Sequence, residues 1–209
     1  MNGLIGKKIG MTQVWDAEGR RVPVTVLEVG PCPVVQVKTK DGADGYDAVQ
    51  VGFGPQKPQR LTKAVRTRFE KAGVAPCKEL HEFDPEGAEV KVGDTLGVDI
   101  FDGTALVDVT AISKGRGFAG VVRRYRMGGG PHGHGGHSKH RIGSIGERDL
   151  PGWIAKGKRM PGHMGAVKVT ARNLAVVQVR KDDNVLLVRG AVPGPSGATV
   201  IVRKALKKA

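Results

Sequence analysis

The sequence predicts a mainly β protein with a small α+β insertion, in which short antiparallel strands close into a barrel and a long, irregular basic extension leaves it. Short runs rich in β-branched residues recur in both halves of the chain, with turn residues between them. These runs do not alternate with helices, as the strands of parallel βαβ units would, so a closed antiparallel barrel is favoured. Between them lies one stretch, Ser113–Lys168, with high positive charge and few core-forming residues.

The first fifty residues are predicted to form β-hairpins. Val22–Val29 and Val34–Lys38 are rich in β-branched side chains, and Asp16–Gly19 supplies a turn before the first of them. We expect residues 1–54 to form the first part of the barrel, beginning with a basic N-terminal arm.

A small α+β insertion is expected at residues 55–93. Leu61–Ala72 carries apolar residues at helical spacing, and Gly73 is the residue type that caps a helix at its C-terminus. Strands resume after the insertion, so residues 94–124 are assigned to the second part of the barrel and residues 166–209 to the last part. The strands predicted there are Thr95–Phe101, Ala105–Ile112, Leu174–Arg180, Val185–Arg189 and Thr199–Arg203.

Ser113–Lys168 holds most of the positive charge of the chain. It carries twelve Lys or Arg against the two acids Glu147 and Asp149, so +10 of the net charge of +14 lies here. It also contains fifteen of the 32 glycines and five of the six histidines, and Tyr125–Gly165 has no Val or Phe. Such a segment buries too little to offset its conformational entropy, whereas a polyanion would order it by neutralising its charge. We predict that residues 125–165 form a Gly/His/Arg-rich basic extension that a polyanion, with nucleic acid as the first candidate, would order.

The bulk properties agree with an anionic partner. The sequence pI is about 10.1, which favours nucleic acid over an acidic membrane surface, because no apolar run approaches the roughly 20 residues of a spanning helix. The N-terminus has no apolar stretch long enough for a signal peptide. Cys32 and Cys77 form no CxxC, so we expect buried, unbridged thiols and a cytoplasmic protein.

Two motifs within the basic segment have alternative interpretations. Gly115–Gly120 matches GxGxxG, but the ribose-binding acid of a dinucleotide site, roughly 20 residues on, has no counterpart before Glu147, so we favour a glycine loop resting on phosphates. The cluster His132, His134, His137 and His140 has no Cys or acid within it, so contacts with ribose, bases and phosphates are favoured over a metal site.

Trp153 has two interpretations that the residues do not separate. It is either a hydrophobic anchor on the barrel or on a neighbouring protein, or a platform that stacks on an RNA base. No GxSxG, HExxH or P-loop is present, so no catalytic residue, cofactor or metal is predicted.

Several motifs together resemble bacterial ribosomal large-subunit protein three. They run in order along nearly the whole chain: Gly3–Thr12 (GLIGKKIGMT), Thr110–Gly120 (TAISKGRGFAG), Gly143–Gly146 (GSIG), Lys156–Gly165 (KGKRMPGHMG) and Gly190–Gly194 (GAVPG).

The resemblance implies a translation-factor-type closed β-barrel and an extension that reaches through ribosomal RNA toward the peptidyl transferase centre. It further implies direct binding of 23S rRNA near its 3′ end, a role in early subunit assembly, and contacts with large-subunit proteins fourteen and nineteen. Glu147, Arg148 and Asp149 would then lie at the extension tip. In some relatives a methylated Gln occupies the position of Asp149, so that modification does not transfer to this chain.

We therefore predict a non-enzymatic, structural RNA-binding protein of the large ribosomal subunit, without membrane or small-molecule partners. The alternative from another class is an enzyme acting on nucleic acid or nucleotides. The predicted rRNA-binding residues are Lys7, Lys8, Lys114, Arg116, Arg123, Arg124, Arg126, His132, His134, His137, Lys139, His140, Arg141, Arg148, Trp153, Lys156, Lys158, Arg159 and His163.

Overall fold

The structure, a computed structural model, describes residues 1–42 and 44–206 and divides the chain into two compact units. The first unit combines Met1–Ile112 with Lys168–Ala209, and the second is Ser113–Val167. No helix in the described part of the chain is both long and apolar enough to cross a membrane.

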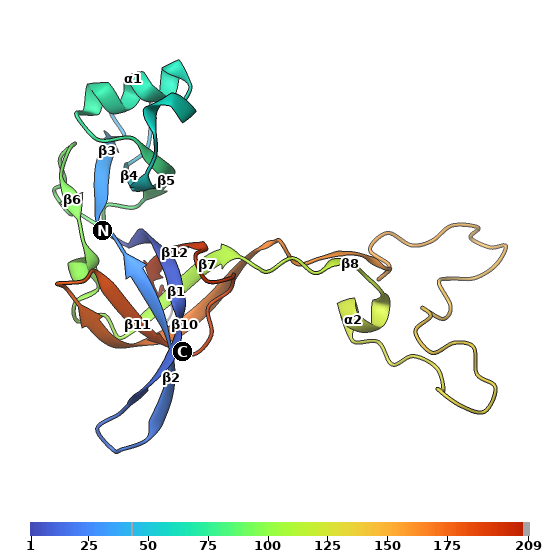
Figure 1. Cartoon of the computed structure of the whole chain (residues 1–209). Coiled ribbons are helices and arrows are strands. Elements are labelled where there is room, and N and C mark those ends of the chain that lie inside the picture. Colours follow the sequence, from blue (N-terminus) through green and yellow to red (C-terminus); the bar gives the residue numbers. More distant parts are fainter. Residues whose placement is uncertain (43, 207–209) are drawn as a thin grey trace. The chain divides into compact units, whose positions relative to one another are not determined.

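Six antiparallel strands of the first unit form a closed ring, in which each strand is hydrogen-bonded to two neighbours (Figure 1). Because β1 pairs with the last strand as well as with β2, the N-terminal strand closes the ring. The order around the ring is β1 (Gly3–Trp15), β12 (Thr199–Lys204), β7 (Leu106–Ile112), β10 (Lys168–Arg180), β11 (Val185–Arg189) and β2 (Arg21–Val29). The mainly β class is confirmed, and so are the strands predicted in the ranges of β2, β7, β10, β11 and β12. β1 was expected only as a basic N-terminal arm.

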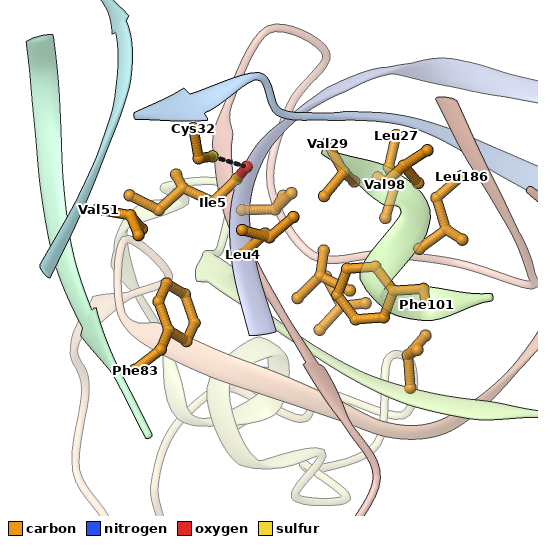
Figure 2. Packing of buried hydrophobic residues seen from close by; sticks show 14 of the residues in the cluster. Leu4, Ile5, Leu27, Val29, Cys32, Val51, Phe83, Val98, Phe101 and Leu186 are labelled. Atoms are coloured by element: carbon orange, nitrogen blue, oxygen red, sulfur yellow. Dashed lines mark hydrogen bonds between the residues drawn. The ribbon is translucent and has the colours of Figure 1, made fainter. Parts of the chain in front are cut away.

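β1 is buried on both faces where it begins. Successive side chains of a strand point to opposite sides, and both Leu4 and Ile5 are almost fully buried. Figure 2 shows Ile5 on the side of Cys32 and Val51, where its carbonyl accepts a hydrogen bond from the Cys32 thiol at 3.3 Å. Leu4 lies on the other side of the strand, and one continuous cluster joins both sides and includes Val98. This strand therefore belongs to two layers of the core.

The second layer is a four-stranded sheet covered by one helix. α1 (Lys63–Ala72) follows a single 3-10 turn, η1 (Pro58–Arg60), and packs Phe69 against Val35 and Cys77. Gly73 ends the helix in the left-handed region (φ 66°), as its sequence position predicted. The strand order in this sheet is β5 (Cys77–Phe83), β4 (Ala48–Pro55), β3 (Cys32–Lys38) and β6 (Thr95–Leu96).

Two expectations are corrected here. Residues 32–38 and 48–54, which the sequence assigned to the barrel, pair in the four-stranded sheet instead. The β-branched composition of Val34–Lys38 predicts a strand but does not specify which strands it pairs with. Thr95–Phe101 is not one strand, because β6 is followed by the 3-10 helix η2 (Val98–Phe101). Val98 and Phe101 lie three residues apart, on one side of that turn, and are fully buried.

The second unit contains little regular structure. Its elements are β8 (Gly117–Ala119), the five-residue helix α2 (Val121–Tyr125) and β9 (Gly162–Met164). Residues 126–161 form a long irregular loop that follows α2 (Figure 1). This unit begins twelve residues earlier than the extension expected at 125–165 and ends two residues later.

Candidate nucleic-acid interface

The second unit begins and ends in a short antiparallel ladder. β8 and β9 pair Phe118 with His163, and the backbone N–H of Arg116 donates to the Met164 carbonyl at 2.8 Å. At the ends of the unit, the Ser113 N–H donates to the Val167 carbonyl at 2.9 Å. Backbone hydrogen bonds thereby hold the two ends of this 55-residue segment together, although it buries few apolar side chains.

Arg124 holds the helix α2 against the returning strand. Its Nη1 donates to the Met160 carbonyl at 2.7 Å, and a Cβ added at Gly162 would lie 2.7 Å from the same nitrogen. The guanidinium groups of Arg124 and Arg159 lie 5.0 and 5.7 Å from the Tyr125 ring centroid, within cation–π range. Arg124, predicted to bind phosphate, is half-buried and has a structural role. Its contacts with the Met160 carbonyl and the Tyr125 ring are called the Arg124 clasp below.

Close backbone approach organises the loop beyond α2. The Gly130 N–H donates to the Ser138 carbonyl at 3.1 Å, and an added Cβ at Gly130 would come within 2.9 Å of that oxygen. The Arg141 N–H donates to the same carbonyl at 3.3 Å. A side chain at Gly130 would therefore open this turn, which explains one part of the high glycine content.

The cations of this unit are exposed and largely unpaired. All of Ser113–Val167 is described, and its one ion pair joins Arg148 Nε to Asp149 Oδ1 at 3.8 Å, with both side chains almost fully exposed. An ion pair of this kind contributes little to stability. The exposed cations without an acidic partner are Lys114, Arg116, Arg123, Arg126, Lys139, Arg141, Lys156, Lys158 and Arg159.

The geometry bears on the dinucleotide interpretation of Gly115–Gly120 and on the metal interpretation of the histidine cluster. β8, within Gly115–Gly120, pairs antiparallel with β9, whereas a dinucleotide site requires a parallel βαβ unit. The five histidines of the unit are exposed, and the His132 and His140 rings meet edge to face at 5.5 Å. Within the described residues no three His, Cys, Asp or Glu side chains are grouped as a metal site requires.

Large apolar side chains are exposed beside these cations. Trp153 is 62% exposed and Phe118 is 79% exposed. The sequence interpretation selected Trp153 but missed Phe118. The signal for Phe118 was an aromatic residue inside a glycine- and cation-rich loop, the composition of a surface on which bases stack.

The two adjacent lysines of the N-terminal arm, Lys7 and Lys8, differ in exposure. Lys7 is exposed, whereas Lys8 is buried and its Nζ donates to the Val192 and Gly194 carbonyls at 2.8 and 3.2 Å. Adjacent residues in β1 point to opposite sides, and this alternation directs Lys8 inward. Lys8, which the sequence predicted to contact rRNA, is therefore held within the fold and has a structural role.

Comparisons with known proteins cover nearly the whole chain. Residues 86–186 match the family described as Ribosomal protein L3. The chain is 48% identical over 208 residues to the large ribosomal subunit protein uL3 of Deinococcus radiodurans, covering 99% of this chain and 96% of that protein. It is 48% identical to the uL3 of Cutibacterium acnes, covering 100% and 94%. It is 51% identical to that of Koribacter versatilis, covering 99% and 88%.

Proposed function

The chain belongs to the uL3 family of large ribosomal subunit proteins, and on that premise we propose that it binds 23S rRNA directly through residues 113–167. It is a structural, non-enzymatic constituent of the large subunit, on the ribosome in the cytoplasm. Binding near the 3′ end of 23S rRNA supports early subunit assembly, and proteins fourteen and nineteen are its neighbours.

The observation that carries this proposal is the row of exposed, unpaired cations on a segment with hardly any core. Phosphate contacts supply most of the affinity of basic proteins for nucleic acid, and each contact releases condensed counterions. Glycine-rich backbone allows close approach to the phosphates, while Phe118 and Trp153 offer apolar faces to bases.

The residues proposed for rRNA contact are the predicted ones without Lys8 and Arg124, whose side chains are held within the fold, and with Phe118 added. The set is Lys7, Lys114, Arg116, Phe118, Arg123, Arg126, His132, His134, His137, Lys139, His140, Arg141, Arg148, Trp153, Lys156, Lys158, Arg159 and His163.

In our proposal the type of barrel, the extension and the position of its tip are those that the family resemblance implies. The six-stranded ring is a closed barrel of the translation-factor type, residues 125–165 are the RNA-penetrating extension, and its tip at Glu147, Arg148 and Asp149 lies near the peptidyl transferase centre. Exposure of all three tip side chains is compatible with such a contact.

A salt titration of the full chain with large-subunit rRNA tests the proposal. If about eight cations meet phosphates, the logarithm of the association constant should fall against the logarithm of salt concentration with a slope on the order of −6. A slope shallower than about −2 would overturn the proposal that many cations of residues 113–167 contact phosphates. The matched variant K156Q/K158Q/R159Q should make the slope shallower by about 2, because three phosphate contacts are removed.

A further inference from the structure

The first unit carries a second concentration of positive charge, which lies outside the segment discussed above. Residues 57–71 hold six cations and one acid, Glu70, so this stretch has a net charge of +5. All six cationic side chains are exposed: Lys57, Arg60, Lys63, Arg66, Arg68 and Lys71. These residues, on η1 and α1, are called the α1 surface below.

The fold gives these cations a fixed platform. Val65 and Phe69, with Ala72 in the last turn, pack on the four-stranded sheet around Val35. Because α1 turns about 100° per residue, this apolar stripe puts Lys63, Arg66 and Lys71 on the opposite, solvent-facing side. The helix ends at Gly73, which holds its last turn through hydrogen bonds from its N–H to the Phe69 and Glu70 carbonyls.

Few of the cations on the α1 surface contact another side chain of the protein. Arg66 Nε lies 3.3 Å from Glu70 Oε1 in an exposed pair, a type of contact that contributes little. Arg68 Nη1 donates to Gln50 Oε1 at 3.5 Å. Lys57, Arg60, Lys63 and Lys71 have no side-chain partner in the described part of the chain.

The composition of the surface distinguishes between two kinds of anionic partner. Protein interfaces concentrate aromatic, Met and apolar side chains at their centre and are depleted in Lys. Residues 57–71 contain no exposed large hydrophobic side chain. Beside the helix, a groove of about 480 Å³ between α1 and β3 is lined by four hydrogen-bond donors and five small aliphatic side chains. The donors are Gln36, Thr67, Arg68 and Lys71, and the aliphatic residues are Val35, Val37, Ala64, Ala72 and Val92. Six exposed cations, with no exposed aromatic or Met side chain among residues 57–71, suit a phosphodiester backbone better than a protein interface.

We propose that the α1 surface is a second RNA-binding surface, which contacts the phosphate backbone through Lys57, Arg60, Lys63, Arg66, Arg68 and Lys71 without reading bases. It differs from residues 113–167 in being built on a folded helix, so it needs no ordering on binding. Lys63 and Lys71 are eight residues apart, about 12 Å along the helix axis, so α1 can contact several phosphates in succession.

The test is a salt titration of rRNA binding by the full chain with the variant K63Q/R66Q/K71Q. Its slope should be shallower than that of the wild type by about 2, since three phosphate contacts are lost. The control variant K40Q/K91Q/R180Q removes the same charge from exposed positions elsewhere in the first unit, and its slope should change by less than about 1. Equal thermal midpoints would establish that both variants are folded.

The outcomes separate this proposal from the proposed function. A loss of slope in K63Q/R66Q/K71Q beyond the control supports the α1 surface. Identical slopes for this variant and its control overturn it, even if K156Q/K158Q/R159Q loses slope and residues 113–167 remain the RNA-binding segment. Unchanged RNA binding together with poor retention in assembled subunits would also overturn it, because it would identify a protein partner for α1.

Discussion

Cationic side chains with partners inside the fold are concentrated in the first unit, which outside the α1 surface differs in this respect from the second. In the first unit Lys8 is held by two backbone carbonyls, Lys38 by Glu82 at 2.9 Å, and Lys181 by Asp102 at 2.7 Å. In Ser113–Val167 nine cations are exposed without an acidic partner. A lysine or arginine thus stabilises the fold where the chain supplies oxygen acceptors for it. Where the chain supplies none, the charge remains available for an external anion.

The first unit also buries far more apolar side chains than the second. Among the described residues, the buried apolar side chains of the second unit are Ala119 and Val121, and all the others belong to the first unit. The first unit therefore has its own source of stability, whereas the second relies on the β8–β9 ladder and on the clasp made by Arg124. The predictions below test this division of roles.

The largest effect is expected from replacing residues 126–162 with a short Gly/Ser linker. The first unit should still unfold cooperatively, because the deletion removes none of its buried side chains and loop length has a weak effect on stability. Affinity for rRNA near 0.1 M salt should fall by about a thousandfold or more, as several phosphate contacts are lost. Calorimetry and filter binding measure the two effects, and loss of the cooperative transition would contradict the separation.

A smaller effect should distinguish the adjacent lysines of β1. Lys8→Met removes two buried charged hydrogen bonds and should lower the free energy of unfolding by about 2–4 kcal/mol. Lys7→Met changes an exposed side chain and should alter stability by less than about 0.5 kcal/mol. Urea unfolding measures both. Equal effects would mean that burial does not determine the role of a lysine in this arm.

A local effect is expected at the clasp of the second unit. Arg124→Lys keeps the charge but loses the planar guanidinium that donates to Met160 and lies against Tyr125. The free energy of local opening should fall by about 1 kcal/mol, the usual size of one such hydrogen bond. Amide hydrogen exchange of β8 and β9 would reveal this, with Arg123→Lys as the exposed control. Equal exchange in the two variants would count against the clasp.

The smallest effect is a pH dependence in the first unit. Burial lowers the pKa of His81, and the nearby charges of Arg203 and Lys168 lower it further. The unfolded state therefore binds a proton more readily than the folded state, so stability should decrease as the pH falls below about 6.5. Urea unfolding at several pH values should show a weaker decrease in His81→Gln between pH 6.5 and 5. An unchanged decrease would assign it to other groups.

Sequence patterns with a local cause predicted the corresponding parts of the structure. The apolar spacing of Leu61–Ala72 and the glycine that follows predicted α1 and its end, because helical periodicity and capping depend on neighbouring residues. The runs Val22–Val29 and Val185–Arg189 predicted ring strands for the same reason. The thiols of Cys32 and Cys77 are buried and unbridged, as expected, and burial raises the pKa of Cys32 to about 12.

The errors arose where a residue depends on distant partners. The β-branched composition of Val34–Lys38 predicted a strand, yet the assignment of that strand to the four-stranded sheet depends on β4 and α1. Thr95–Phe101 had strand composition, but burial of both Val98 and Phe101 in the main hydrophobic core favours a 3-10 turn. Lys8 and Arg124 looked like phosphate ligands because their acceptors, the carbonyls of residues 192, 194 and 160, are remote in sequence.

The sequence by itself determined the mainly β class, the position of helix α1 and the concentration of charge in Ser113–Lys168. These properties depend on composition and short-range spacing, which folding does not alter. Only the tertiary structure decided which strands close the ring, which cations are held inside the fold, and which remain exposed. Those outcomes depend on contacts between residues far apart in the chain, where the burial of a side chain and the acceptors around it are set by packing.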